Sequence, residues 1–376
     1  MRVSLSSLKG GKRGQYLCAL TVVAVAATLD HRHNEKAFQH TMSSPSIPET
    51  MRAVTPAKAG GPEVLRIEML PVPTPEAGQL LIKVAWAGIN PHDVGQRTRG
   101  APPPGQTPIL GLEVAGEVVA AGDEAGAARI GEKVCALVPG GGYAEYCLSP
   151  SVLAFPQPAR LSEKEAGALM ENLFTAWFNM MELAGLQPGE RVLVHGGTGN
   201  IGSTAIQLAR LIGAESYATV GTEEKKQLCE SLGATRVINY RTEDFVDVIT
   251  KATGGEGVNV VVDPSGSSDG EKNIEALARD GRVVYVTGGK KGLVSTVPVS
   301  AIMHKRARIT GSLMRPLEMG RKLAVAAALR ERVWPELGVS IRPLLDSAFT
   351  LEQAADAHRR SESGEAAGKI LLKVGT

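Results

Sequence analysis

A glycine-rich stretch in the second half of the chain has the residue types and spacing of a phosphate-binding turn. The short run Val192–His195 precedes the glycine segment 196–202, and apolar residues recur at a helical period after it. Gly199 and Gly202 let the backbone turn tightly against a pyrophosphate, and the free N–H groups of the first helical turn would face that anion. The order strand, turn, helix therefore predicts a dinucleotide site, with a structural turn that binds no ligand as the alternative.

The end of the next expected strand determines which dinucleotide fits. An NAD site usually places Asp or Glu there, about 20 residues after the glycine turn, to bind the ribose 2′-hydroxyl. This chain has Gly221 and Thr222 at that point and Lys225 three residues further on. Thr222 can cap the following helix, and together with Lys225 it favours an added 2′-phosphate. The acidic pair Glu223 and Glu224 opposes this unless it faces solvent. The pattern predicts NADP rather than NAD.

Three further loops are expected near the same ligand. Tyr240 follows the third expected strand, where its ring could stack on an adenine or simply lie at the surface. Ser265 and Gly266 follow the fourth expected strand, and Thr287 and Gly288 follow the fifth. Because the carboxyl ends of parallel strands form the ligand crevice, the last two loops should approach the nicotinamide half of the cofactor. Plain turns are the alternative.

The first half of the chain offers few metal ligands. A zinc dehydrogenase needs Cys, His, Asp or Glu side chains that can meet around one ion. His92, Asp93 and Glu113 are candidates, but no cysteine lies near them in sequence, and the four cysteines show no paired spacing. No Ser/His/Asp spacing indicates a hydrolase. We therefore predict no metal site, with a site at His92 and Asp93 as the alternative.

The residues before the glycine turn are predicted to form a barrel-like β domain. They alternate short β patterns with rigid turns such as Pro102–Gly105, which cannot lie inside a sheet. Many short strands joined by turns are typical of such a domain. A helical segment, Glu163–Ala184, is expected to connect it to the glycine turn. The expected strands are Met51–Val54, Val64–Glu68, Gln79–Ala87, Glu113–Ala121, Lys133–Val138 and Ala144–Leu148.

After the glycine turn, expected strands and helices alternate, as a parallel, doubly wound sheet requires. Further strands are expected at Ser216–Val220, Arg236–Asn239, Val258–Asp263, Arg282–Val286 and Arg308–Gly311. Helices are expected at Glu223–Leu232, Asp244–Ala252, Glu271–Leu277, Gly320–Arg332 and Leu351–Arg359. A last strand, Lys369–Val374, is expected to return to the β domain.

Composition and the first 50 residues bear on the cellular context. A hydrophobic content of 43%, a charged content of 21% and a net charge of +2 describe an ordinary soluble protein without a nucleic-acid or acidic-membrane surface. The apolar run Tyr16–Leu29 is short for a membrane span and suits a signal-peptide core. Either this segment exports or tethers the protein, or the working protein begins at Met42 or Met51. We favour the second reading, because a domain-like pattern starts abruptly at Met51, and we predict a cytoplasmic protein.

From Met51 to Val374 the chain resembles the quinone oxidoreductase (zeta-crystallin-like) family of zinc-free medium-chain dehydrogenases/reductases. The family motifs occur in family order and spacing. They are Ala87-Gly-Ile-Asn-Pro-His-Asp93, Ile109-Leu-Gly-Leu-Glu-Val-Ala-Gly116, Pro139-Gly-Gly-Gly-Tyr-Ala-Glu-Tyr146, Glu171-Asn-Leu-Phe-Thr-Ala-Trp177, the glycine turn and Val237-Ile-Asn-Tyr240. The resemblance implies a GroES-like substrate domain over residues 51–172 and 311–376 and a Rossmann NADP-binding domain over 173–310. Residues 1–50 would be an extension outside the fold.

The resemblance also implies roles for individual residues. Asn90 would lie beside the nicotinamide and Thr175 near the nicotinamide ribose, and these two would carry catalysis. The pyrophosphate would lie on Gly199, Asn200 and Ile201, and the 2′-phosphate and adenine on Gly221, Thr222, Lys225 and Tyr240. One departure concerns the substrate: family members often have pocket tyrosines shortly after the asparagine, and residues 94–102 here contain none.

The reaction implied by the resemblance is direct hydride transfer from NADPH to a small quinone or activated alkene, by a homodimer, without an obligatory metal or a dedicated acid. Two other functions stay open. An enoyl-thioester reductase would need a long pocket with basic residues at its mouth, for which Arg97 and Arg99 are candidates. A non-enzymatic NADPH-binding protein is the other, since relatives serve as lens structural and RNA-binding proteins, although no basic stripe for RNA is present.

Overall fold

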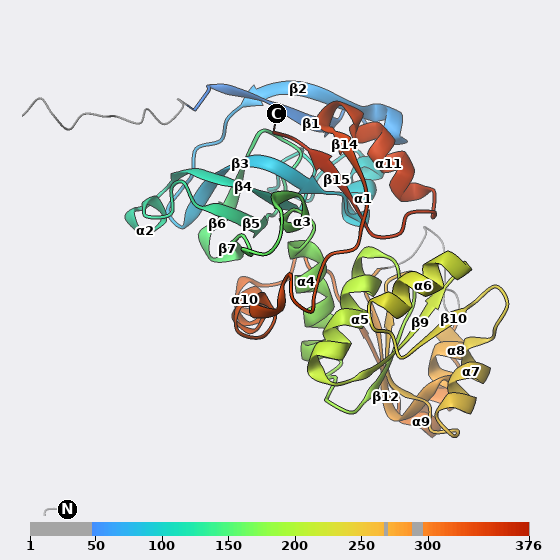
Figure 1. The fold of residues 1–376 in the computed structure, drawn as a ribbon. Coiled ribbons are helices and arrows are strands. Elements are labelled where there is room, and N and C mark those ends of the chain that lie inside the picture. The colour runs from blue at the N-terminus through green and yellow to red at the C-terminus, as the bar shows by residue number, and fades with distance from the viewer. Residues whose placement is uncertain (1–46, 267–269, 288–295, 376) are drawn as a thin grey trace, which may run out of the picture. The chain divides into compact units, whose positions relative to one another are not determined.

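Two sheets organise the part of the chain that the structure describes. The computed structural model describes residues 47–266, 270–287 and 296–375, and these described residues pack as one unit. A seven-stranded sheet belongs mainly to the first half of this unit, and a six-stranded parallel sheet belongs to the second (Figure 1). None of the helices in the described ranges combines the length and apolar character that crossing a bilayer demands. The predicted apolar run Tyr16–Leu29 lies outside the described residues.

The parallel sheet has the strand order β10-β9-β8-β11-β12-β13. Its strands are β8 (Arg191–Val194), β9 (Glu215–Val220), β10 (Arg236–Asn239), β11 (Val258–Asp263), β12 (Leu277–Tyr285) and β13 (Arg308–Gly311). The chain runs outward from β8 in one direction and then, from β11, in the other. A ligand crevice forms at such a reversal, outside the carboxyl ends of the strands. The predicted α/β, doubly wound fold class is confirmed.

Helices cover both faces of this sheet, because side chains alternate along each strand. Val192 and Val194 pack with the apolar face of α5 (Asn200–Ile212), whereas Leu193 packs with α7 (Phe245–Ala252) on the opposite face. Apolar residues at successive positions are what a strand buried on both faces requires. The remaining helices are α6 (Glu223–Ser231), α8 (Gly270–Glu275) and α9 (Val299–Lys305), of which α9 was not predicted.

The second sheet includes two strands from the far end of the chain. Its order is β14-β15-β3-β4-β5-β7, with β6 also paired to β3. These strands are β3 (Gln79–Gly88), β4 (Glu113–Ala121), β5 (Lys133–Leu137), β6 (Tyr146–Pro150), β7 (Ala154–Pro156), β14 (Leu345–Thr350) and β15 (Lys369–Lys373). Leu371 of β15 pairs with Gly88 of β3 in antiparallel register, which confirms the predicted return of the last strand.

A two-stranded ribbon and short helices complete this half. The ribbon is β1 (Thr50–Pro56) and β2 (Leu65–Pro71). Its first residue, Thr50, is the last residue of the predicted extension, and the division of the chain at that point stays a prediction. The short helices are η1 (Pro62–Val64), α1 (Pro91–Arg99), α2 (Glu124–Ala127), η2 (Ser151–Leu153), η4 (Trp334–Glu336), η5 (Leu351–Gln353) and α11 (Ala354–Glu362).

The predicted helical segment Glu163–Ala184 is helical over most of its length, but it is interrupted where the chain packs on β3. The first part, α3 (Glu163–Ala166), ends at Gly167, where an added Cβ would lie 2.8 Å from the Cβ of Trp86. The chain resumes as α4 (Met170–Trp177) and continues as a π-helix, η3 (Phe178–Leu183). Helical periodicity continues across the break, so the sequence pattern does not show it.

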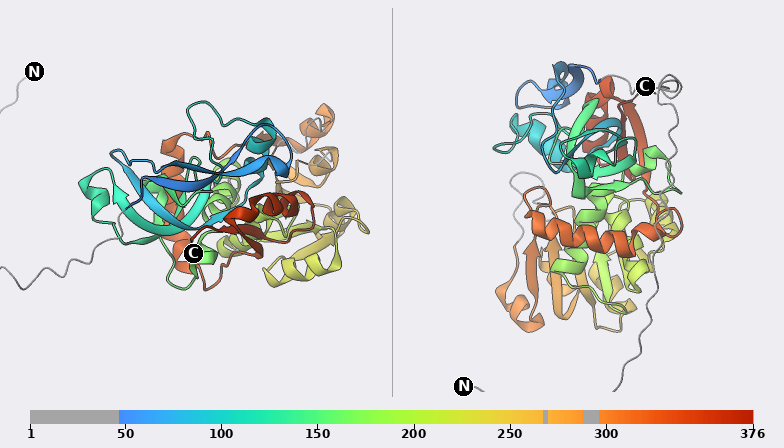
Figure 2. Two further views of the ribbon diagram at one scale, coloured as in Figure 1. Left: turned by 90° about the horizontal axis from the view of Figure 1, so that it is seen from above. Right: turned by 90° about the vertical axis from the view of Figure 1, so that its left-hand side faces the viewer.

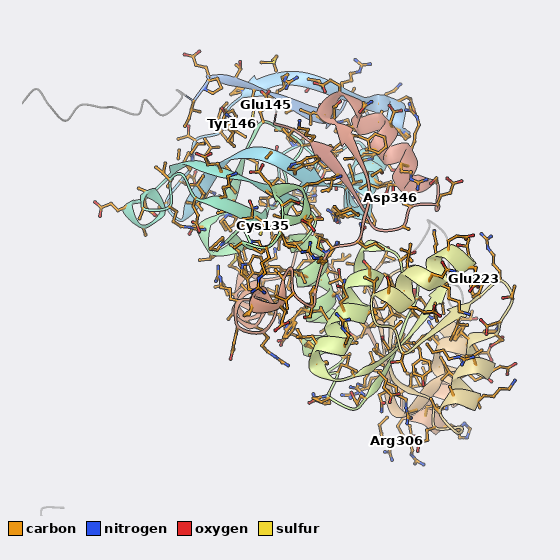
Figure 3. All side chains as sticks on the ribbon, viewed as in Figure 1. Cys135, Glu145, Tyr146, Glu223, Arg306 and Asp346 are labelled. Atoms are coloured by element: carbon orange, nitrogen blue, oxygen red, sulfur yellow. The ribbon has the colours of Figure 1, made fainter. Side chains whose placement is uncertain are left out.

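Helix α4 and helix α10 (Met319–Arg332) join the two halves in one apolar cluster. Phe174 of α4 and Leu329 of α10 belong to the same cluster as Val194 of the parallel sheet and Cys135 of β5. The right-hand view of Figure 2 shows α10 lying across the boundary between the two sheets, and Figure 3 shows Cys135 at the same boundary. A packed apolar cluster therefore joins the two halves.

Candidate active site

A cavity of about 500 Å³ lies where α1, α4 and the glycine turn meet. Its walls also include the loops that follow β11, β12 and β13. Most of the predicted site residues line it. They are Asn90, Thr175, Gly199, Asn200, Ile201, Ser265 and Thr287. The structure thus brings the two predicted catalytic residues and the predicted pyrophosphate turn to one site.

The glycine turn is folded so tightly that one position excludes a side chain. A Cβ on Gly202 would lie 2.2 Å from the carbonyl oxygen of Gly196. Gly199 precedes α5 and offers no side chain to cap it, so the first N–H groups of this helix are left for another acceptor. Asn200 and Ile201 in that first turn line the cavity. The turn therefore has the N–H groups and the helix N-terminus that a pyrophosphate requires.

The residues predicted to bind the 2′-phosphate and adenine lie together at the ends of β9 and β10. A Cβ on Gly221 would lie 2.6 Å from the hydroxyl oxygen of Tyr240, so the glycine makes room for the tyrosine ring, which is 56% exposed. Thr222 caps α6 by accepting from the Lys225 N–H at 3.3 Å, and the Lys225 ammonium donates to the Gly364 carbonyl at 3.2 Å. These residues do not line the cavity. They form a basic and aromatic surface beyond it.

Asp263 organises the loop after β11. Its Oδ1 accepts from the Ser265 N–H at 2.9 Å, the Ser265 hydroxyl at 2.6 Å and the Gly266 N–H at 3.0 Å. Ser265 and, after β12, Thr287 line the cavity, whereas Gly266 does not, and Gly288 lies outside the described residues. Contact of this loop with a nicotinamide stays a prediction.

Helix α1 forms one wall of the cavity and was not predicted from the sequence. Asn90 is its cap, Pro91 takes the first helical position, and the Asp93 carboxylate accepts from the Asn90 N–H at 2.9 Å. Proline at the first position and an acidic residue at the third are a known helix-start pattern. The start signal of this helix was therefore present in the sequence.

The Asn90 side chain belongs to a buried ionic network that was not predicted from the sequence. Its Oδ1 accepts from the Lys369 ammonium at 2.6 Å, and its Nδ2 donates to Glu113 at 3.1 Å and to the Gly88 carbonyl at 3.3 Å. Lys369 and Glu113 form a direct ion pair, with side chains 0% and 1% exposed. Lys369 also donates to the Asn172 Oδ1 at 3.3 Å. The network holds Asn90 in one orientation at the edge of the cavity.

These contacts leave Asn90 one way to bind a ligand. A side-chain amide has two hydrogens to donate and two lone pairs on its oxygen. Both hydrogens are used by Glu113 and Gly88, and one lone pair is used by Lys369. Asn90 can therefore accept one further hydrogen bond but has no donor left.

A second buried carboxylate supports the same wall. Asp93 accepts from the N–H groups of Asn90 and Gly111, both at 2.9 Å, and from the Tyr143 hydroxyl at 3.2 Å. Burial raises the pKa of Asp93 to about 6, and the two backbone hydrogen bonds limit the rise. Burial also raises the pKa of the Tyr143 phenol well above its usual value. The hydrogen bonds of Asp93 thus tie α1 to the loop before β4.

The two arginines predicted for a pocket mouth point to different places. Arg99 lines the cavity. The prediction that Arg97 lies at the pocket mouth is wrong. Its side chain is 2% exposed and donates twice to Glu362, at 2.8 Å each. Residues two apart on a helix lie on different faces, so only one of the pair could reach the cavity. A third arginine, Arg315, also lines the cavity and was not predicted.

The candidate metal ligands do not converge. His92 lines the cavity, its Nε2 is buried without a partner among the described residues, and burial and then Arg315 lower its pKa to about 4. Asp93 and Glu113 belong to the two networks described above. Within residues 47–266, 270–287 and 296–375, no three His, Cys, Asp or Glu side chains form a group that could hold an ion.

Two family models match the chain. The alcohol dehydrogenase GroES-like domain matches residues 76–159, and the zinc-binding dehydrogenase matches residues 200–328. The human quinone oxidoreductase is 34% identical over 329 residues, which are 86% of this chain and 97% of the relative. A phenolphthiocerol/phthiocerol polyketide synthase subunit of Mycobacterium tuberculosis is 32% identical over 306 residues, which are 80% of this chain and 14% of that protein.

Solved structures with the same fold differ in their nucleotide. The quinone oxidoreductase of Thermus thermophilus, also solved in complex with NADPH, has a TM-score of 0.73 and is 29% identical. An NAD-dependent alcohol dehydrogenase has a TM-score of 0.77 and is 32% identical. Each comparison covers 86% of this chain and 100% of the other.

Proposed function

The chain belongs to the quinone oxidoreductase family of zinc-free medium-chain dehydrogenases/reductases, and we propose that it reduces quinones or activated alkenes with NADPH by direct hydride transfer. The cavity of about 500 Å³ carries this proposal, because Asn90 and Thr175 share it with the glycine turn. A dinucleotide lying along that turn would place its nicotinamide and a substrate in the same space.

The nucleotide preference rests on residues of this chain rather than on the fold, since one structural neighbour is named NAD-dependent and another was solved with NADPH. The end of β9 carries Gly221 and Thr222 in place of the acidic residue that binds a ribose 2′-hydroxyl. Lys225 lies within the first turn of α6, where the helix N-terminus also favours a negative charge. A phosphate is therefore accommodated better than a hydroxyl.

Bound NADPH would supply a hydride from the C4 carbon of its nicotinamide. Asn90 would accept from the carboxamide N–H of that ring through its one remaining lone pair and so fix the ring's orientation. It would not bind the substrate carbonyl, because both of its hydrogens are used. Hydride transfer requires the two carbons to be held about 3–3.5 Å apart, and the rigid network around Asn90 serves that positioning.

A steady-state assay of NADPH oxidation tests this function. The acceptors are a panel of quinones, an enone and crotonyl-CoA, each measured with NADPH and with NADH. We expect quinone or enone reduction with NADPH, and a lower turnover in Asn90→Ala with nearly unchanged NADPH affinity. A destabilised but fully active Asn90→Ala enzyme would show that Asn90 serves only the fold. If NADPH binds but none of the acceptors oxidises it, the result would support the non-enzymatic alternative.

An enoyl-thioester reductase is the second candidate. It is favoured by the similarity to a segment of a polyketide synthase subunit and by Arg99 and Arg315 at the cavity, which could bind the phosphates of a thioester carrier. The crotonyl-CoA arm of the assay separates the two candidates: a kcat/KM for crotonyl-CoA above that for every quinone would favour the thioester.

We also propose that the protein is a homodimer. Strand β13 ends the parallel sheet, so its outer edge has no partner strand among the described residues, and Ile309 on it is 40% exposed. An unpaired strand edge can pair with the same edge of a second copy. Size-exclusion chromatography with light scattering tests this, and a monomeric mass would contradict it.

A further inference from the structure

We propose that Glu171 is the proton donor of the reaction and holds at its carboxyl group the proton that the substrate takes up when the hydride arrives. This inference rests on the proposed function. It adds an acid where the family resemblance implies none.

Glu171 lies in the wall between two cavities. It is in the first turn of α4 and lines the large cavity together with Asn90 and Thr175. It also lines a second, inner cavity of about 50 Å³. Its backbone N–H donates to the Glu113 carboxylate at 3.1 Å, which fixes the start of α4 to the buried network. The side chain therefore lies at the substrate cavity and also borders a second cavity.

The hydroxyl of Thr175 connects this carboxyl group to the predicted catalytic residues. Thr175 lies one helical turn after Glu171, and its Oγ1 donates to the Glu171 Oε1 at 3.4 Å. Thr175 itself lines the substrate cavity. One carboxyl oxygen is thus oriented by a hydroxyl that faces the substrate, and the other is available for a proton.

The inner cavity is suited to ordered water. Its walls are mainly apolar, but Arg315 and Lys322 line it together with Glu171. The Arg315 Nη1 donates to Gln96 at 2.7 Å, whereas its Nε and Nη2 are buried without a partner in the described part of the chain. A cavity of this size that contains several polar groups can hold water that bonds to two or more of them. Water there would accept from Arg315 and donate to Glu171, which gives the carboxyl group a route to a new proton.

The surroundings favour a protonated carboxyl group near neutral pH. Burial, and then the charge of Glu113, raise the pKa of Glu171 to about 7, while Lys369 opposes the rise. Charged groups on five different segments interact with Glu171. They are Glu113 of β4, Asp93 of α1, Lys369 of β15, Arg315 after β13 and Lys322 of α10. A general acid is most effective when its pKa lies near the working pH.

The step balances without any further reactant. The hydride carries two electrons to the substrate and leaves it as a hydroquinone monoanion or an enolate. The O–H bond of Glu171 breaks as a new O–H bond, or a C–H bond on the enolate, forms on the substrate, and its electron pair stays on the carboxylate. A proton from solvent then restores Glu171. The sum is NADPH, substrate and one proton giving NADP⁺ and reduced substrate.

The pH dependence of kcat in Glu171→Gln and in the wild type tests the proposal. The wild type should turn over at a constant rate below the pKa of Glu171 and lose about tenfold per pH unit well above it. Glu171→Gln should be about 10²-fold slower at pH 6, should not vary with pH, and should approach the wild type at high pH. A variant within twofold of the wild type at pH 6, or one that keeps the alkaline fall, would overturn the proposal.

Two further variants guard against indirect effects. Glu182→Gln makes the same change at an exposed site on η3 and should leave kcat and its pH profile unchanged. Glu171→Asp keeps a carboxyl group and should retain the alkaline fall at a reduced rate; loss of that fall would overturn the proposal even if Glu171→Gln does not fold. NADPH affinity should be equal in all variants, because the carboxyl group acts on the substrate.

A measurement without turnover separates this inference from the proposed function. Carbon-13 NMR of glutamate-labelled protein should show one carboxyl resonance that titrates near pH 7 and is missing in Glu171→Gln. If that resonance is present but the wild type reduces no quinone or enone, the proposed function fails and the catalytic role fails with it. An active wild type without that resonance overturns the role of Glu171 alone.

Discussion

Replacing Lys369 by methionine should destabilise the protein more than other lysine substitutions in the same strand. Methionine keeps the length of the side chain but removes the charge and the donors. Glu113 would then be a buried carboxylate without a cation, and the side-chain oxygens of Asn90 and Asn172 would lose a donor. Removing one partner of a buried ion pair costs about 3–5 kcal/mol.

The size of the effect can be checked by urea unfolding followed by tryptophan fluorescence and by calorimetry. A loss of about 4 kcal/mol corresponds to a fall in Tm of roughly 5 °C for a chain of this size. Lys373→Met, in the exposed position of the same strand, should change the free energy of unfolding by less than about 0.5 kcal/mol. Both variants make the same chemical change in the same strand, so the difference isolates the buried ion pair.

The double variant Lys369→Met with Glu113→Gln separates charge from shape. With both charges removed, the glutamine side chain that replaces Glu113 can still accept from Asn90, and most of the lost stability should return, to within about 1–2 kcal/mol of the wild type. If Lys369→Met costs less than about 1 kcal/mol, or if adding Glu113→Gln restores nothing, the buried ion pair does not control the stability of this site.

Three other predictions concern the cofactor, metals and pH. Lys225→Ala should raise the KM for NADPH about tenfold or more and leave that for NADH nearly unchanged; equal losses would contradict the phosphate role. Dialysis against EDTA should leave activity intact, with well under one zinc per chain by elemental analysis, and stoichiometric zinc would refute this. Glu362→Gln should be less stable than the wild type at pH 7. Because the hydrogen bond from Arg97 lowers the pKa of Glu362 in the folded state, the stability difference should be full above the carboxylate's ordinary pKa. The stability difference should shrink as the pH falls through the lowered pKa of Glu362. A difference that stays constant between pH 7 and pH 3 in urea unfolding would contradict this prediction.

The fold was predictable because its signals are local. A few neighbouring residues are enough to specify the glycine turn, the helix caps at Thr222 and Asp244, and the strands β10 and β11. Strands β10, β11 and β13 begin and end where predicted. Helix α1 was missed although Asn90, Pro91 and Asp93 carry its start signal, because the helix has few apolar residues to set a period.

The centre of the site was not predictable in the same way. Lys369 is in a strand where a lysine would ordinarily face solvent, and its partners are Asn90 and Glu113, far away in the sequence. The approach of Gly167 to Trp86 and the burial of Arg97 beneath α11 likewise depend on the packing of distant segments. Such contacts follow from tertiary structure, and no local pattern encodes them.

The span between Asn90 and Lys369, 279 residues in sequence, also determines when the protein becomes active during folding. Contacts between distant segments form late, because the chain between them must first be ordered. Until β15 pairs with β3, Glu113 has no cation and Asn90 has no fixed orientation. Partly folded molecules with a complete parallel sheet would therefore bind nucleotide before they can turn over. In a refolding experiment, recovery of activity should lag behind recovery of NADPH binding. Activity would then report the completely folded protein, whereas NADPH binding would report only the half that contains the parallel sheet.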